Sequence, residues 1–352
     1  MLYIINPRKK TSKILQHMIS QFTHENYTIV QDESINLNNK KILLAIDVDE
    51  TLSDINMLKF MKKLIKKDKN GFLGSYCGII CASVSELGTK DTCQDIVFLA
   101  NSMGATFIGH PMVEAIKGLI NFSTWQKVLN IPLYDILIER CKILNERLRN
   151  FQFEKYEELN VTVLYSTPNK VSNSLDLWRM VKSNFDASIN IKEILIENGS
   201  IQDCKGCGYK VCTHYGKDNK CFYGGPMISD VLPSIEKSNV IVWICPNYND
   251  AIAANLTAVM NRLTVLYNKK PFHDKVTFGI IVSGNSGGDS VAKQLIGALN
   301  LNKGFMLPPK AFLLATANDP KSIFNYKDVD KLAKNFSERI KAIQNSQCTI
   351  HT

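Results

Sequence analysis

Four cysteines lie close together in the second half of the chain, and their spacing suits metal binding. They are Cys204, Cys207, Cys212 and Cys221, separated by two, four and eight residues. Gly206 and Gly208 lie among them and permit the tight turns that would let several thiolates bind one centre. We expect these cysteines to be metal ligands, and a [4Fe–4S] cluster, a zinc ion, or redox-active or structural thiols all fit the pattern. His214, in the same stretch, is an alternative ligand.

Three polar loops in the same half offer groups that could hold a flat, phosphorylated ligand. The loop at 166–174 leads into a helix, whose free N–H groups suit a phosphate. The loop at 246–250 adds an aromatic ring and amides, and the loop at 283–288 has glycines that admit close backbone approach. The residues predicted to bind this ligand are Ser166, Pro168, Asn169, Lys170, Ser172, Asn173, Ser174, Pro246, Asn247, Tyr248, Asn249, Ser283, Gly284, Asn285, Gly287 and Gly288.

Each of these loops also has a purely structural interpretation. Asn173 or Ser174 could simply cap a helix, and the other two loops could be ordinary turns. However, the carboxyl ends of parallel strands meet at one edge of a sheet, where ligands bind at the switch point of the strand order. Three polar loops at one such edge therefore favour a binding site.

A further motif lies in the first half, after the apolar stretch KILLAI. Asp47, Asp49 and Thr51 form a D-x-D-x-T pattern, which resembles the nucleophile motif of haloacid dehalogenase phosphatases. Asp47 would attack phosphorus and Asp49 would act as acid and base. We disfavour this interpretation, because no later acidic pair completes a Mg²⁺ site and the preceding strand is the third of its domain, whereas that family uses its first. With Glu50, these acids would also repel an anionic ligand nearby.

An internal repeat arranges the motifs along the chain. The first strand of each half runs into a turn that contains a proline, Pro7 or Pro168, and then into a helix. The stretches that begin at Gly78 and Gly279 also match, as strand, polar loop, helix, glycine and strand. Pro168 lies 161 residues after Pro7, and Gly279 lies 201 residues after Gly78. The second copy has therefore gained 40 residues, and the clustered cysteines lie within them.

Strands and helices alternate in both halves, which predicts parallel sheets covered on both faces. In the second half the predicted strands are 161–166, 191–197, 239–245, 276–283 and 311–316, with helices near 173–185, 227–237, 251–267, 289–299 and 328–344. In the first half the predicted strands are 2–5, 27–31, 41–46, 77–83 and 106–108. A charged helical connector is expected at 145–160, between domains at 1–150 and 151–352.

Composition agrees with two globular domains in a reducing compartment. A length of 352 residues and a hydrophobic content of 45% suit two domains with packed cores. No apolar run of about 18 residues predicts a membrane span. The N-terminus lacks the features of a secretory signal, so the ten cysteines indicate the cytoplasm rather than disulfides. The net charge of +9 is spread widely, and the lysine-rich stretch 59–69 fits the solvated face of a helix better than a nucleic-acid patch.

The second half resembles the NAD(P)H-dependent FMN reductase family, and especially its iron–sulfur flavoprotein branch, over about residues 161–316. The first loop is similar to that family's S-x-P-R-x-x-S-N-S phosphate turn, with Asn169 where arginine is usual. Pro246 to Tyr248 resembles the P-x-Y flavin loop, and Asn261-Arg262 resembles the D-R that ends the following helix. The clustered cysteines stand where that branch carries its cluster ligands, with wider spacing.

The resemblance implies an α/β protein of two tandem flavodoxin-like domains, each a parallel five-stranded sheet with helices on both faces. It implies FMN in the second domain and a degenerate, mainly structural first domain, which together form a pseudo-dimer within the chain; a homo-oligomer is a further expectation. The implied function is FMN-dependent reduction or electron transfer, with NAD(P)H or a small redox protein as donor and no nucleic-acid or membrane partner. The alternatives are a zinc- or thiol-containing flavin or quinone reductase and a non-catalytic flavin-binding module. No catalytic side chain is predicted.

Overall fold

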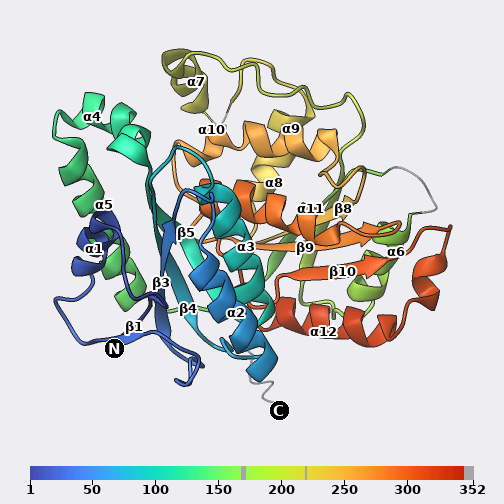
Figure 1. Ribbon diagram of the computed structural model, residues 1–352. Helices are drawn as coiled ribbons and strands as arrows, with labels where there is room; N and C mark the ends of the chain where they lie inside the picture. The colour runs from blue at the N-terminus through green and yellow to red at the C-terminus, as the bar shows by residue number, and fades with distance from the viewer. Residues whose placement is uncertain (168–171, 219, 345–352) are drawn as a thin grey trace, which may run out of the picture. The chain divides into compact units, whose positions relative to one another are not determined.

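The structure is a computed structural model that describes residues 1–167, 172–218 and 220–344 (Figure 1). Its contacts divide the chain into two compact units. The first is Met1–Gln152 with Leu307–Lys310, and the second is Phe153–Met306 with the described residues from Ala311 on. Each unit has one five-stranded sheet flanked by helices. The predicted fold of two tandem flavodoxin-like α/β domains is confirmed. Among the described helices, none has the length and apolarity that crossing a bilayer requires.

The first domain has the strand order β2-β1-β3-β4-β5, and all its strand pairs are parallel. Its strands are β1 (Leu2–Ile5), β2 (Tyr27–Val30), β3 (Lys41–Val48), β4 (Tyr76–Ser83) and β5 (Thr106–Ala115). Its helices are α1 (Lys13–Ser20), α2 (Ile55–Lys67), α3 (Thr89–Ser102), α4 (Ser123–Leu129) and α5 (Leu133–Asn150), with a 3₁₀ segment at Lys117–Phe122. The central strand β3 is a nearly continuous apolar run, because both of its faces are covered.

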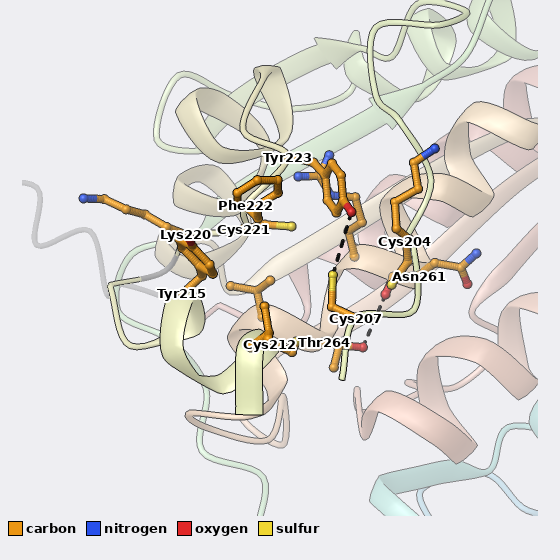
Figure 2. A pocket seen from close by; sticks show the side chains of 14 residues that line it. Cys204, Cys207, Cys212, Tyr215, Lys220, Cys221, Phe222, Tyr223, Asn261 and Thr264 are labelled. Carbon is orange, nitrogen blue, oxygen red and sulfur yellow. Dashed lines mark hydrogen bonds between the residues drawn. The ribbon is translucent and has the colours of Figure 1, made fainter. Parts of the chain in front are cut away.

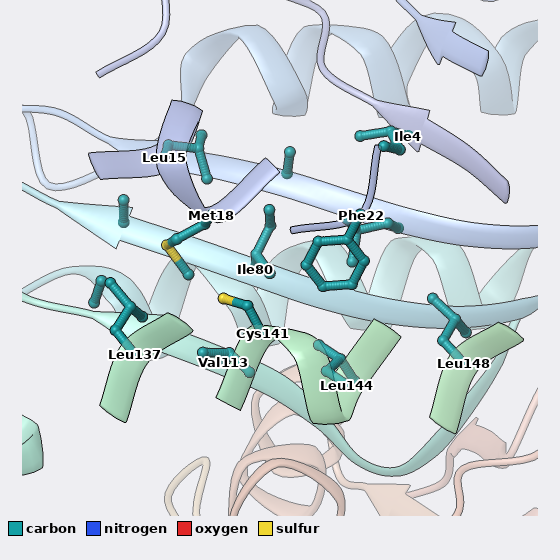
Figure 3. Packing of buried hydrophobic residues seen from close by; sticks show 14 of the residues in the cluster. Ile4, Leu15, Met18, Phe22, Ile80, Val113, Leu137, Cys141, Leu144 and Leu148 are labelled. Carbon is teal, nitrogen blue, oxygen red and sulfur yellow. The ribbon is translucent and has the colours of Figure 1, made fainter. Parts of the chain in front are cut away.

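Helices α1 and α5 cover one face of this sheet and supply much of its core (Figure 3). Leu15 and Met18 of α1, Leu144 and Leu148 of α5 and Ile80 of β4 belong to one cluster, and all five side chains are buried. Each such side chain contributes roughly 1.5–3 kcal/mol when it leaves water. Helices α2 and α3 lie on the opposite face (Figure 1). The loops at the carboxyl ends of the strands are therefore held by a core packed on both sides.

The second domain repeats this topology with the order β7-β6-β8-β9-β10, again with all pairs parallel. Its strands are β6 (Asn160–Tyr165), β7 (Asn190–Leu195), β8 (Val240–Pro246), β9 (Val276–Ser283) and β10 (Phe312–Thr316). Its helices are α6 (Asn173–Lys182), α7 (Tyr209–Gly216), α8 (Leu232–Lys237), α9 (Ala254–Arg262), α10 (Thr264–Tyr267), α11 (Gly288–Leu295) and α12 (Val329–Lys341), with π-helical turns at Met227–Val231 and Ile296–Lys303 and a 3₁₀ turn at Ser322–Asn325. The strands predicted in this half are all present, within two residues of their expected bounds. In the first half β5 runs to Ala115, seven residues beyond the predicted end at 108, and the other four strands lie within two residues of their predicted bounds.

Two predicted helices differ from the structure. The connector predicted as a helix at 145–160 is wrong in its second half, because α5 ends at Asn150 and the chain is extended from Phe151. The ring of Phe151 packs against Tyr76, with 5.0 Å between ring centroids, so its burial fixes an extended exit. The helix predicted at 251–267 begins only at Ala254 and divides into α9 and α10 around Leu263.

Candidate functional site

The three polar loops of the second domain meet at one edge of its sheet. They follow β6, β8 and β9, which are neighbours in the order β9-β8-β6, so their carboxyl ends lie side by side. The chain leaves β6 for β7 on one side and places β8 on the other, so the winding direction reverses between β6 and β8. This is the switch point at which open parallel sheets bind ligands.

The first loop ends in a well-formed helix start. The Ser172 hydroxyl caps α6 by accepting the N–H of Leu175, and it lies 3.1 Å from the hydroxyl of Ser174. The hydroxyls of Ser166 and Thr167 are buried and have no hydrogen-bond partner among the described residues. Pro168, Asn169 and Lys170, which the sequence places in the same turn, lie outside the described residues.

The side chain of Asn173 makes three hydrogen bonds to backbone groups near the end of β10. Its amide donates to the carbonyls of Ala317 (3.1 Å) and Asp319 (2.9 Å), and its oxygen accepts the N–H of Ile323 (3.3 Å). The side chain therefore ties the start of α6 to the segment after β10, and its contacts are with protein rather than with the open edge of the loop.

The second and third loops are tied to each other by Asn247. Its amide lies 3.0 Å from the carboxylate of Asp250, 3.1 Å from the Ser283 hydroxyl and 2.8 Å from the Ser286 carbonyl, and all three accept. Pro246 ends β8 directly before it. The ring of Tyr248 is 55% exposed, so it stands free at the edge of the sheet. Asn249 is also exposed and has a positive φ of 53°.

The glycines of the third loop lie close to neighbouring side chains, and Gly287 also has a positive φ. Gly287 precedes α11 with φ +81°, and a Cβ there would overlap the carboxylate of Asp250. A Cβ on Gly284 would lie 2.9 Å from the Asn318 amide oxygen, and one on Gly288 would lie 3.2 Å from the Ser283 hydroxyl. Asn285 is exposed at the tip of the loop. Gly287 therefore suits both the backbone conformation and the space beside Asp250.

The sequence analysis did not predict one polar residue at this edge of the sheet. Asn255, in the first turn of α9, is buried, and its amide donates to the carbonyls of Ser166 (3.4 Å) and Ile196. It therefore joins α9 to the ends of β6 and β7. The signal was an amide at an otherwise apolar position of a helix, but only the fold shows which carbonyls it reaches.

The four clustered cysteines line one cavity of about 150 Å³ (Figure 2). Apolar and aromatic side chains form much of its wall, and the Cys207 sulfur lies 4.0 Å from the Tyr223 hydroxyl. Gly206 has a positive φ of 66°, which turns the chain between the first two cysteines. His214 is exposed and does not line the cavity. The structure thus brings together all four predicted ligands and leaves out the alternative one.

The cysteines of the cavity and Lys303 influence one another's pKa values. Burial, followed by the other three cysteines, raises the pKa of the Cys212 thiol. Lys303, whose ammonium donates to the Thr264 hydroxyl at 2.8 Å, has its pKa lowered by burial and raised in turn by Cys204 and Cys212. Within the described ranges, no three His, Cys, Asp or Glu side chains converge closely enough to hold a single metal ion.

At the corresponding edge of the first domain, a carboxylate side chain lies at the helix start. Ser12 caps α1 just as Ser172 caps α6, but here the Ser12 N–H donates to the carboxylate of Asp47 at 2.7 Å. Arg8, nearby, is buried in an ion pair with Asp54, and burial lowers the pKa of its guanidinium. The helix start that matches the phosphate loop of the second domain is thus occupied by a side chain.

Comparison with known proteins finds a family match within the second half of the chain. Residues 159–319 match the NADPH-dependent FMN reductase family. The matched region contains β6 to β10, the three polar loops and the four clustered cysteines. The resemblance predicted from the loop motifs is confirmed, and the FMN reductase match supports an oxidoreductase that uses FMN.

Several solved structures are similar to this chain at low identity. An azoreductase from Bacillus anthracis str. Sterne is 11% identical over 53% of this chain and 100% of its own, with a TM-score of 0.39. An NAD(P)H:quinone oxidoreductase from Methanothermobacter marburgensis is 11% identical over 53% and 96%, with a TM-score of 0.38. The Trp repressor binding protein from Bacillus subtilis is 14% identical over 50% and 96%, with a TM-score of 0.34. No curated protein sequence matches the chain.

Proposed function

We propose that the protein is an iron–sulfur flavoprotein whose second domain carries both of its redox groups. FMN binds at the carboxyl edge of the sheet, and a [4Fe–4S] cluster binds to Cys204, Cys207, Cys212 and Cys221. NAD(P)H or a small redox protein supplies the electrons. The observation that carries the proposal is that four cysteines line one cavity within a domain of FMN reductase sequence.

The first loop fits the phosphate of FMN. A buried hydroxyl without a partner costs about 1–3 kcal/mol, and the hydroxyls of Ser166 and Thr167 have none among the described residues. Phosphate oxygens would accept from both, at a helix start that favours negative charge. Tyr248 and the backbone of the third loop would border the flavin ring, with Asn247 fixing the two loops against each other.

The cysteine cavity fits a cluster better than a single ion. Each thiolate of a [4Fe–4S] cluster binds a different iron, so its sulfurs stand further apart than the ligands of one zinc ion. Four cysteines around one cavity could supply one thiolate to each of the four irons. The lysine at 303 would offset the negative charge of the cluster.

The two groups supply the electron chemistry, since bound FMN exchanges hydride or electrons and the cluster exchanges single electrons. The protein contributes binding and orientation. The serine hydroxyls and the α6 start would hold the phosphate, and Asn247 sets the spacing of the two loops. Aromatic side chains border the cysteines on the cavity wall (Figure 2). No side chain at this edge is needed as an acid or base.

The absorption spectrum of anaerobically purified protein, combined with assays of iron, zinc and acid-labile sulfide, tests the proposal. Flavin bands with a broad iron–sulfur shoulder and about four irons and four sulfides per chain are expected. If the protein contains flavin and zinc but no sulfide, the cysteines bind zinc and the protein is a zinc-containing flavin or quinone reductase. If the protein contains flavin but no metal, the remaining alternatives are a thiol-containing reductase and a non-catalytic flavin-binding module.

The phosphate site has its own test. Ser166→Ala should weaken FMN binding about tenfold or more, since a hydrogen bond to a charged group contributes about 1.5–3 kcal/mol. Ser234→Ala is the matched control, because Ser234 is equally buried in this domain and donates to the carbonyl of Asp230 at 2.6 Å. Equal FMN affinity for both variants, measured by fluorescence titration, would reject the assignment of the loop.

A further inference from the structure

The end of α9 holds both ends of the cysteine segment, defined here as residues 203–223. The guanidinium of Arg262 donates through Nη1 to the carbonyl of Gln202 at 3.3 Å, and through Nη2 to the carbonyl of Gly224 at 3.1 Å. Gln202 directly precedes the segment and Gly224 directly follows it. One side chain therefore closes the loop that carries all four cysteines.

The neighbouring residue fixes the start of the same segment. The amide of Asn261 donates to the carboxylate of Asp203 at 2.8 Å, and that carboxylate also accepts the N–H of Cys204 at 2.7 Å. The backbone of the first cysteine is thus positioned from α9 through one shared carboxylate. Figure 2 shows Asn261 next to Cys204, on the side of the cavity formed by α9.

Arg262 is also a buried charge without a carboxylate partner. Its side chain lines the cavity, the residue is only 3% exposed, and its Nε finds no acceptor within the described part of the chain. No ion pair with a described carboxylate involves it, and no carboxylate lines the cavity. A buried guanidinium is unfavourable unless an anion lies close. Its hydrogen-bond acceptors among the described residues are the two carbonyls at the ends of the cysteine segment.

We propose that Arg262 is the positioning residue of the cysteine site, which it serves in two ways. It clamps the ends of the cysteine segment through its two carbonyl contacts, and its charge balances the thiolates and the metal centre that they hold. The second role rests on the proposed function, whereas the clamp does not. The fork of the guanidinium is essential to the clamp, since an ammonium cannot reach two carbonyls in fixed directions.

Three variants of the full chain separate these roles. Arg262→Gln removes both the fork and the charge, whereas Arg262→Lys removes the fork and keeps the charge. Arg339→Gln is the control, because Arg339 lies on α12 of the same domain and its Nε also lacks a partner among the described residues. Amide hydrogen exchange over residues 203–223 reports the clamp. Iron and sulfide per chain, with the midpoint potential of the metal centre, report the charge balance.

Both Arg262 variants should exchange amide hydrogens in the cysteine segment at least tenfold faster than the wild type, and Arg339→Gln should not. Arg262→Gln should lose several-fold more iron and sulfide than Arg262→Lys, and the centre that remains should have a lower midpoint potential, because a nearby positive charge stabilises its reduced form. Unchanged exchange in both Arg262 variants would overturn the clamp. Equal metal content and potential in the wild type and Arg262→Gln would overturn the charge balance.

A wild-type protein without metal would reject both the cluster and the charge-balancing role. Faster exchange in the Arg262 variants would then still support the clamp, so the failure of the proposed function can be told apart from the failure of this inference.

Discussion

Burial separates the described cysteines into two chemical groups. Cys77, Cys81, Cys93, Cys141 and Cys245 are buried in strands or helices. Burial raises the pKa of Cys141 and Cys245 to about 12, so these groups remain neutral thiols. The four cysteines of the cavity are exposed or half-buried instead. The apolar residues around each isolated cysteine are a local signal of this burial.

Single cysteine substitutions should show that the four act as one set. Changing Cys204, Cys207, Cys212 or Cys221 to Ala should each lower bound metal sharply, because a four-ligand centre loses its closed shell. Cys245→Ala should leave metal content intact, since Cys245 is buried in β8. The measurement is iron, zinc and acid-labile sulfide on anaerobic preparations. If Cys221→Ala alone retains metal, the fourth ligand is a residue other than Cys221. If all four variants retain full metal, these cysteines do not form a metal site.

The ion pair in the first domain predicts a large effect on stability. Asp54 pairs with buried Arg8, accepts the N–H of Asp47 at 2.9 Å, and caps α2 by accepting the N–H of Met57 at 2.9 Å. Asp54→Asn should therefore lower the free energy of unfolding of this domain by about 3–5 kcal/mol, because it leaves a buried charge uncompensated. Asp49→Asn should change it little, since Asp49 is exposed and bonds only within its turn to Thr51. Urea unfolding with a probe specific to this domain distinguishes the two variants.

The sequence could not show these contacts because they join distant parts of the chain. Arg8 and Asp54 are 46 residues apart, and Arg262 lies 60 residues from Gln202. The D-x-D-x-T pattern was visible, but the partner of Asp47 is a backbone N–H at another helix start. Residue types indicated which groups could do chemistry, whereas the fold decides which of them meet.

At the scale of elements, strands were more predictable than helix ends. A strand buried on both faces needs an uninterrupted apolar run, as in β8 and β9, and this signal is local. The end of α5 depends on Phe151 packing against Tyr76, which is distant in sequence. The break between α9 and α10 leaves Asn261 and Arg262 at a helix end, where they reach the cysteine segment.

Two loops of the second domain should behave as one element. Asn247 connects the loop after β8 to the loop after β9 through the Ser283 hydroxyl and the Ser286 carbonyl. Asn247→Ala should weaken FMN binding and lower the free energy of unfolding by about 0.5–1.5 kcal/mol, because the Ser283 hydroxyl and the Ser286 carbonyl lose their donor. Asn285→Ala, at the exposed tip of the third loop, should leave stability unchanged. Thermal unfolding of the flavin-free proteins gives the comparison, and equal stability of the two variants would contradict the coupling.

At the scale of the whole molecule, the two domains share a topology and differ at the edge that binds ligands. Both have the same strand order and a serine cap at the first helix, Ser12 or Ser172. In the first domain the carboxylate of Asp47 already accepts the N–H of Ser12. Since a helix start accommodates one anion, this carboxylate would exclude a phosphate there. The repeat therefore preserves the fold while the first copy fills its own anion site.

This difference predicts one FMN per chain, and a matched pair of substitutions tests which domain holds it. Aspartate caps helices as well as serine does, so Ser172→Asp and Ser12→Asp should both leave their helices intact. Ser172→Asp places a carboxylate at the proposed phosphate site and should abolish flavin binding by repulsion. Ser12→Asp should leave the flavin-to-protein ratio at one, because its site holds Asp47 instead of a phosphate. Flavin absorbance against protein concentration, measured on the full chain after FMN loading, decides the matter. A ratio near two in the wild type, or a loss of flavin in Ser12→Asp alone, would place FMN in the first domain and reverse the assignment.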